Sequence, residues 1–141
     1  MSKKITCGIL VKTSDDKFLI GHSTNNEHYD IPKGQQEEGE TYIETAIRET
    51  KEEFNLCFNE KDLTFITLEK LNKKKNLALF YTKLKNNVDI KDLYCSTFVN
   101  NDLSFPEIDY YVIVNKEELL KKVSKSLKEY LLNNNIFDRI S

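Results

Sequence analysis

Short runs of apolar and β-branched residues alternate with polar segments along the chain, and each run predicts a β-strand. The expected strands are residues 4–13, 17–21, 64–71, 77–84, 94–99 and 109–114. The polar residues 14–16 predict a turn, so the chain is expected to begin with a β-hairpin. The lysine- and asparagine-rich residues 72–76 are expected to form the tip of a second hairpin. Polar loops are expected at residues 23–27, 59–62, 86–92 and 100–104.

Two segments carry apolar residues at helical spacing. In the first, Thr41 is placed to cap the N-terminus and Glu44 completes a capping box. The apolar stripe of this helix consists of Ile43, Ala46, Ile47 and Phe54. In the second, Asn115 caps a single final helix and Glu118 completes its capping box. The stripe of the final helix consists of Leu120, Val123, Leu127, Tyr130 and Leu131.

This order of strands and helices predicts an α/β fold, in which a mixed sheet lies between helices as an α/β/α sandwich. The 141 residues suit one domain, residues 1–141. A net charge of −2 gives no overall field that would draw the protein to nucleic acid or to a membrane. No apolar run approaches the length of a membrane span or of a signal peptide's apolar region. Three widely spaced cysteines fit reduced thiols, so a cytoplasmic location is expected.

The first helix carries a group of acidic residues at a spacing that suits metal binding. Glu49, Glu52 and Glu53 stand at i, i+3 and i+4, so their carboxylates share one exposed side of the helix. Like charges at this spacing repel, and a hard divalent cation would turn the repulsion into attraction. The alternative is a solvated acidic helix face, which is the usual role of a glutamate-rich helix.

The segment from Gly34 to Leu56 resembles the Nudix box, whose pattern is Gly-x5-Glu-x7-Arg-Glu-U-x-Glu-Glu-x-Gly-U, with U a bulky apolar residue. The residues in register are Gly34, Glu40, Arg48, Glu49, Glu52, Glu53 and Leu56. The preceding residues 29–34, Tyr-Asp-Ile-Pro-Lys-Gly, resemble the family's lead-in, with Tyr29 where tryptophan is more usual. The resemblance implies a single Nudix hydrolase domain with the sandwich architecture.

Two positions of the box depart from the family pattern. Thr50 stands where an aliphatic residue is usual, which loosens packing on the apolar stripe but removes no ligand. Asn55 replaces the last glycine, and asparagine is the best non-glycine residue for the left-handed conformation that ends a helix. Both changes are therefore expected to be tolerated.

The resemblance assigns roles to the box residues. Glu52 and Glu53 are the chief ligands of Mg²⁺ or Mn²⁺, and Glu49 is a further ligand or the base that activates water. The backbone carbonyl of Lys33 supplies another ligand oxygen. Arg48 completes the catalytic set by holding a carboxylate in place, and Gly34 and Glu40 support the site structurally. Metals in such a site neutralise phosphate charge and lower the pKa of a bound water, which suits hydrolysis of a pyrophosphate bond.

Residues outside the box are candidates for the same site. Glu107 is a candidate for an extra metal ligand or base, with an ordinary surface glutamate as the alternative. His28 is a candidate acid or base because its charge changes near neutral pH, and a surface or packing role is the alternative. Tyr29, Tyr81 and the Lys33 side chain are candidate substrate contacts, although aromatic residues on alternating strands are routinely buried.

These features predict a hydrolase that cleaves a phosphoanhydride bond in a nucleoside diphosphate linked to another group. The lead-in resembles members that act on dinucleoside polyphosphates and on phosphorylated 5′ ends of RNA, and these are the first expectation for the substrate. ADP-ribose and (d)NTP hydrolysis are the alternatives, and a nucleotide-binding sensor without turnover is an alternative of another class. The expected partner is thus a nucleotide-type small molecule or an RNA 5′ end, with no membrane and no obligate protein partner.

Overall fold

A computed structural model describes residues 4–99 and 105–141 of the chain. Its strands are β1 (Lys4–Lys12), β2 (Phe18–Ser23), β3 (Tyr29–Asp30), β4 (Lys33–Gln35), β5 (Thr64–Lys70), β6 (Lys75–Lys83) and β7 (Ile108–Val114). Its helices are α1 (Tyr42–Phe54), α2 (Lys116–Lys122), α3 (Lys125–Asn133) and α4 (Ile136–Arg139), with short 3-10 helices η1 (Glu60–Asp62) and η2 (Ile90–Asp92).

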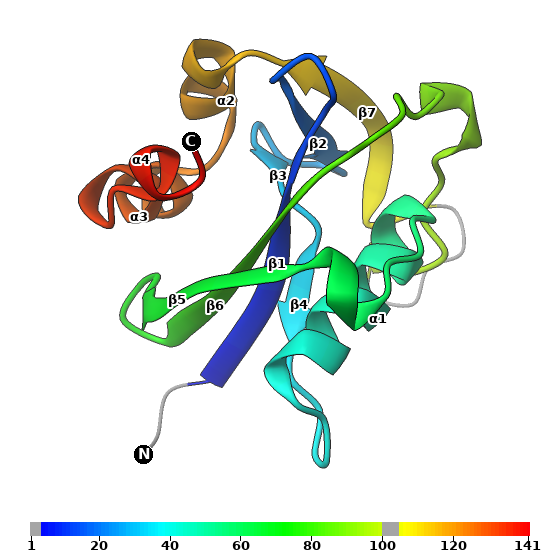
Figure 1. Ribbon diagram of the computed structural model, residues 1–141. Coiled ribbons are helices and arrows are strands. Elements are labelled where there is room, and N and C mark those ends of the chain that lie inside the picture. The colour runs from blue at the N-terminus through cyan, green and yellow to red at the C-terminus, as the bar shows by residue number, and fades with distance from the viewer. Residues whose placement is uncertain (1–3, 100–104) are drawn as a thin grey trace.

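The strands form one mixed sheet in the order β3-β2-β1-β6-β5. β1 runs parallel to β6, from the pair Lys4–Lys75 to the pair Lys12–Lys83. The other pairs are antiparallel: β4 lies beside β1, and β7 lies beside β2. α1 lies on one face of this sheet, and α2, α3 and α4 lie on the other (Figure 1). The predicted α/β/α sandwich is therefore confirmed.

Each face of the sheet has its own hydrophobic core. The core under α1 contains Cys7, Ile9, Ala46 and Phe54, because odd-numbered positions of β1 point towards this helix. The core on the other face contains Leu10 of β1 together with side chains of α2, α3 and α4. Strand alternation thus buries apolar side chains on both faces, as expected for a sheet that is covered on both sides.

The predicted single final helix is wrong, because three short helices replace it. α2 ends at Lys122, and the following residue, Val123, is extended (φ −78°, ψ 166°). The Ser124 side chain then caps α3 by accepting from the Leu127 N–H. A break at this point turns α3 so that Leu127 and Tyr130 still reach the core. Leu119 is the fully buried residue of α2, whereas Leu120 is only half-buried.

The predicted strand at residues 94–99 is also wrong. Residues 94–97 are irregular, and Phe98 forms an isolated β-bridge with Pro106. The physical reason is that this backbone serves other partners: the Ser96 N–H donates to a carbonyl of α1, and the Thr97 carbonyl accepts from the Glu107 N–H. The loop expected at residues 100–104 lies outside the described ranges.

The other elements largely agree with the pattern. The strands expected at residues 64–71, 77–84 and 109–114 correspond to β5, β6 and β7, each shifted by at most two residues at its ends. The loop 72–76 is a hairpin tip that overlaps the first residues of β6. Both capping boxes, at Thr41 and at Asn115, are present.

Candidate active site

The site is built around the short strand β4 and the helix that follows it. β4 pairs with β1, so that Gly34 lies opposite Cys7 and Lys33 lies opposite Gly8. A Cβ on Gly34 would come within 2.0 Å of the Glu49 carboxyl carbon. The Glu49 carboxylate occupies the space that a side chain would need, so any other residue at this position would displace that carboxylate from the turn.

α1 is fixed at both ends by local interactions. At its start, the Thr41 Oγ1 accepts from the Glu44 N–H, and the Glu44 carboxylate accepts from the Thr41 N–H at 2.9 Å. At its end, Asn55 is left-handed (φ 57°, ψ 34°), as predicted, and its side chain donates to the Asp92 carbonyl at 3.1 Å. Thr50 is fully buried, and its hydroxyl donates to the Ala46 carbonyl at 2.8 Å. The half-polar side chain at this position therefore has a hydrogen-bond partner.

Arg48 joins the loop to the acidic face of α1. Its Nε donates to Glu40 Oε2 at 2.7 Å and its Nη2 donates to Glu40 Oε1 at 3.0 Å, which is a bidentate pair. Its Nη1 donates to Glu49 at 2.9 Å and to Glu52 at 3.3 Å. Arg48 thus contacts two of the three candidate ligands, and its role in catalysis stays a prediction.

The hydrogen bonds from Arg48 set the charge state of Glu40. They hold the pKa of the Glu40 carboxyl at about 2, below its usual value of 4.5, and N–H and O–H donors from Glu37 and Thr45 act in the same direction. The pKa of Arg48 is raised in turn, chiefly by the bond to Glu40. Both groups are therefore charged throughout the physiological range of pH.

The other carboxylates of the site lie in a very different environment. Glu53 is only 7% exposed, so the expectation that it lies on an exposed helix face is wrong. β4 covers it, and the Lys33 N–H donates to Glu53 Oε1 at 2.9 Å. Burial raises the pKa of Glu53 well above its usual value. Burial also raises the pKa of Glu49, against the opposing effect of the Arg48 charge.

The donor chemistry of these residues fits a hard divalent cation. Carboxylate oxygens converge on the turn at Lys33 and Gly34, and oxygen is the ligand that Mg²⁺ and Mn²⁺ prefer. Within residues 4–99 and 105–141, no three His, Cys, Asp or Glu side chains are already spaced to hold a metal ion. The Glu49 and Glu52 carboxylates contact Arg48 instead, and that of Glu53 contacts the Lys33 N–H.

Two further candidates lie close to this group. The Lys33 Nζ lies 3.0 Å from Asp30 Oδ2, so Asp30 neutralises the ammonium that was expected to contact substrate. Glu107 is exposed just before β7, and its negative charge is near enough to raise the pKa of Glu49. The roles of Lys33 and Glu107 in metal or substrate binding stay predictions.

The structure does not join the remaining two candidates to the box. Tyr81 is half-buried on β6 and packs against the core on the α3 face, which favours the packing alternative. His28 is exposed in the loop before β3, where its N–H donates to Asn26 Oδ1 at 3.2 Å.

Tyr29 belongs to an aromatic cluster, here defined as His22, Tyr29 and Tyr110, that the sequence did not reveal. The Tyr29 and Tyr110 hydroxyls are 2.6 Å apart, and the His22 ring is stacked on Tyr110 with centroids 4.6 Å apart. The Lys122 Nζ lies 4.7 Å from the centre of the Tyr29 ring. Alternation along β7 separates Tyr110 from Tyr111, but the register that brings Tyr110 beside His22 could not be read from one strand alone.

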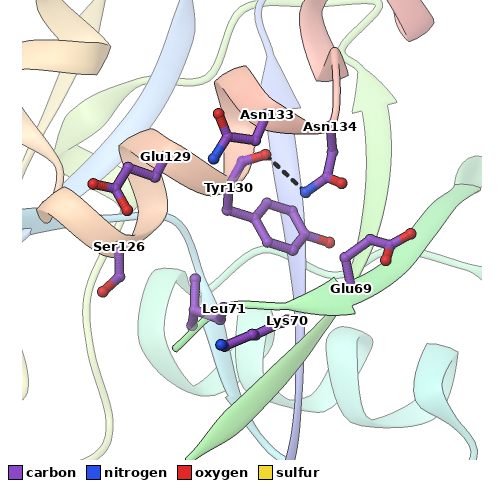
Figure 2. A pocket seen from close by; sticks show the side chains of 8 residues that line it. All are labelled: Glu69, Lys70, Leu71, Ser126, Glu129, Tyr130, Asn133 and Asn134. Atoms are coloured by element: carbon purple, nitrogen blue, oxygen red, sulfur yellow. Dashed lines mark hydrogen bonds between the residues drawn. The ribbon is translucent and has the colours of Figure 1, made fainter. Parts of the chain in front are cut away.

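A pocket of about 350 Å³ lies elsewhere, between β5 and α3 (Figure 2). Glu69 and Lys70 line it from the strand, and Glu129, Tyr130 and Asn134 line it from the helix and its end. The Asn134 side chain donates to the Tyr130 carbonyl at 3.0 Å, shown by the dashed line in Figure 2. No residue of the box lines this pocket, so the carboxylate site, and not this pocket, is the candidate active site.

Among known protein families, the NUDIX domain matches residues 2–122 of this chain. The chain therefore belongs to the Nudix family of pyrophosphohydrolases. A comparison with curated protein sequences gave no match. In the described part of the chain, no helix has the length and apolar character needed to cross a membrane.

Solved structures share the fold over nearly the whole chain. An Ap4A hydrolase from C. elegans, in a binary complex, superposes with a TM-score of 0.69 at 23% identity, covering 96% of this chain and 99% of that one. The NUDIX domain of Shewanella oneidensis NrtR, complexed with ADP ribose, gives a TM-score of 0.73 at 10% identity, covering 100% and 90%. The E. coli dihydroneopterin triphosphate pyrophosphohydrolase gives 0.64 at 15% identity, covering 94% and 99%. At these identities the likeness shows the fold and not the substrate.

Proposed function

We propose that this protein hydrolyses a phosphoanhydride bond in nucleoside diphosphate-linked substrates with Mg²⁺ or Mn²⁺, and that dinucleoside polyphosphates or 5′-phosphorylated RNA ends are its substrates. One observation carries the proposal: the Glu49 carboxylate lies against Gly34, Glu53 accepts from the Lys33 N–H, and Arg48 contacts both Glu49 and Glu52. Three carboxylates joined in this way through Arg48 and the Lys33–Gly34 turn suit a hard cation and a polyphosphate chain.

Each residue of the site has its own proposed role. Glu52, Glu53 and the Lys33 carbonyl would hold the metal, with Glu49 as a further ligand. A bound metal supplies neutralisation of phosphate charge and lowers the pKa of a coordinated water. In the alternative role, Glu49 would accept the proton of that water, with its carboxylate held in place by the Arg48 Nη1 at 2.9 Å. Arg48 keeps Glu49 oriented, and Glu40 keeps Arg48 oriented.

The aromatic cluster supports the choice of a nucleotide substrate. Tyr110 is 45% exposed, and Tyr29 is partly buried against the core on the face of the sheet opposite α1. An exposed ring held by neighbours on its other sides is a surface on which a base can stack. We therefore propose that Tyr29 and Tyr110 contact the base of the substrate. A cytoplasmic location stays a prediction.

The test is product release from a substrate panel: diadenosine polyphosphates, 5′-triphosphorylated RNA, ADP-ribose, NADH and the (d)NTPs. Each substrate is incubated with Mg²⁺, with Mn²⁺ and with EDTA. Cleavage of diadenosine polyphosphates or RNA ends that EDTA abolishes is the expected result. Cleavage confined to ADP-ribose or (d)NTPs would overturn the choice of substrate. Nucleotide binding that raises the melting temperature without cleavage of any substrate would overturn the enzymatic proposal in favour of a sensor.

A further inference from the structure

The last turn of α1 presents backbone carbonyls that no residue of the helix can satisfy. The Lys51 carbonyl accepts from the Asn55 N–H, which is the last bond of the helix. The carbonyls of Glu52 and Glu53 lie beyond this point and need partners from elsewhere. These two carbonyls belong to the residues that carry the proposed chief metal ligands.

Partners come from two segments that are distant in sequence. Ser96 donates to the Glu52 carbonyl twice, from its N–H at 2.7 Å and from its hydroxyl at 3.1 Å. The Tyr111 hydroxyl donates to the Glu53 carbonyl at 2.5 Å. Tyr111 is 8% exposed, and its ring packs edge-on against Phe54 with centroids 4.9 Å apart. The end of α1 is thus tied to β7 on one side and to the loop around Ser96 on the other.

We propose that Tyr111 and Ser96 are positioning residues that hold Glu52 and Glu53 ready for the metal. The inference rests on the proposed function, which makes these two glutamates ligands. A helix end frays readily when its carbonyls lack partners, and repulsion among the glutamate side chains favours fraying here. Fixing the two carbonyls keeps the last turn wound, so that both carboxylates project from the helix in a constant geometry before metal arrives.

The hydrogen bonds from Tyr111 and Ser96 fix the backbone of the ligand residues themselves, in addition to stabilising the helix. The left-handed Asn55 already ends α1, and contacts of Phe54 already hold it to the sheet. The hydroxyl of Tyr111 adds a fixed point at the backbone of Glu53, one residue before Phe54. Removing that hydroxyl should therefore weaken metal binding more than its effect on stability explains.

Tyr130 offers a matched control for this test. It is also a buried tyrosine, 2% exposed, and its hydroxyl donates to the Leu77 carbonyl at 2.8 Å. It lies in the core on the opposite face of the sheet from α1. Tyr111→Phe and Tyr130→Phe thus each delete one hydroxyl that donates to a backbone carbonyl, and only the first touches a ligand residue.

The experiment measures binding of Mn²⁺ alone to the full chain, by electron paramagnetic resonance of the free ion, together with melting temperatures. Both variants should melt a few degrees lower than the wild type, since each loses one buried hydrogen bond. The Kd for Mn²⁺ should rise about tenfold in Tyr111→Phe, as expected for a partner that orients ligands, and less than twofold in Tyr130→Phe. With substrate, kcat should fall in Tyr111→Phe at saturating metal while KM stays near the wild-type value.

Ser96→Ala is the second variant, and it should fold normally because Ser96 is exposed and keeps its N–H bond. The Kd of Ser96→Ala for Mn²⁺ should rise by a smaller factor than that of Tyr111→Phe. The Kd of the double variant should exceed that of either single variant. Equal Mn²⁺ affinities of Tyr111→Phe and Tyr130→Phe would overturn the inference. Wild-type protein that binds Mn²⁺ but cleaves no nucleotide would overturn the proposed function alone, because the comparison of affinities needs no turnover.

Discussion

At the scale of single residues, the site depends on two glutamates with opposite surroundings. Glu40 lies where it accepts hydrogen bonds from Arg48, Thr45 and a backbone N–H, so its negative charge is stabilised. Glu53 is buried and accepts a single N–H from Lys33, so its negative charge is costly without a cation. The same side chain is thus a stabilised anion at one position and, under the proposed function, a metal ligand at the other.

The bidentate pair of Arg48 predicts that lysine cannot replace it. Arg48→Lys keeps the charge but loses the fork that contacts Glu40, Glu49 and Glu52 together. The turnover rate should fall roughly 10- to 100-fold, in line with the loss of a partner that orients ligands. Steady-state rates at saturating Mg²⁺ measure this. Arg139→Lys, which alters an arginine bound to the Ile66 carbonyl, is the control and should leave the rate unchanged.

The depressed pKa of Glu40 predicts how stability depends on pH. Because the pKa is lower in the folded protein than the usual 4.5, ionised Glu40 stabilises the fold above about pH 4.5, and this contribution is lost as pH falls towards 2. The wild type should therefore exceed Glu40→Gln in free energy of unfolding at pH 7, and the gap should close between pH 4.5 and pH 2. Urea denaturation at several pH values measures the gap. A gap that is constant over this range would contradict the assignment.

At the scale of elements, the sequence predicted both ends of α1, but not which of its side chains are buried. Its caps are local, so Thr41, Glu44 and Asn55 could be assigned from residue type and spacing alone. The last helix could not be divided in this way, because the periodicity continues through Val123 and Ser124 although the backbone there is extended. Residues 94–99 have strand-like composition, but hydrogen bonds of Ser96 to α1 and of Thr97 to Glu107 decide their conformation.

The C-cap of α1 predicts different effects for two small substitutions. Asn55→Ala places alanine in the left-handed region, where its Cβ is unfavourable and it cannot form the hydrogen bonds of the asparagine side chain. This change should lower the free energy of unfolding by about 1–2 kcal/mol. Asn55→Gly adopts the same conformation freely and should remain within about 0.5 kcal/mol of the wild type. Chemical denaturation compares the two. Equal destabilisation by alanine and glycine would show that the lost side-chain bond to Asp92, and not the conformation, matters.

At the scale of the whole molecule, the sheet joins residues that the sequence kept apart. Antiparallel pairing of β2 with β3 and with β7 assembles the aromatic cluster, and β7 also carries Tyr111 to the end of α1. The box residues could be found from spacing because one helix and its preceding turn contain them. The contacts of Tyr110, Tyr111 and Ser96 could not, because they depend on strand register and on loop paths.

The aromatic cluster predicts a specific loss of substrate affinity. Tyr110→Ala removes the exposed ring and should raise KM for a nucleotide substrate about tenfold, since stacking on a base contributes roughly 1–3 kcal/mol. Tyr110→Phe keeps the ring and loses only the hydroxyl contact with Tyr29, so its KM should stay within a factor of about two. Steady-state kinetics on the best substrate of the panel compare them. An unchanged KM in Tyr110→Ala would remove the cluster from the substrate site.

The central claim, that the box glutamates hold a catalytic metal, is tested most directly by Glu53→Gln. The change keeps the shape and the oxygen that accepts from the Lys33 N–H, but removes the negative charge. Glu44→Gln on the same helix is the control, because Glu44 belongs to the capping box and should leave turnover near the wild-type rate.

The measurement is kcat of wild type, Glu44→Gln and Glu53→Gln with Mg²⁺, with folding checked by circular dichroism. Turnover of Glu53→Gln should fall at least about a thousandfold, because a catalytic metal supplies several kcal/mol of charge stabilisation and each 1.36 kcal/mol is a factor of ten. A folded Glu53→Gln protein that cleaves substrate at near wild-type rates would contradict the account.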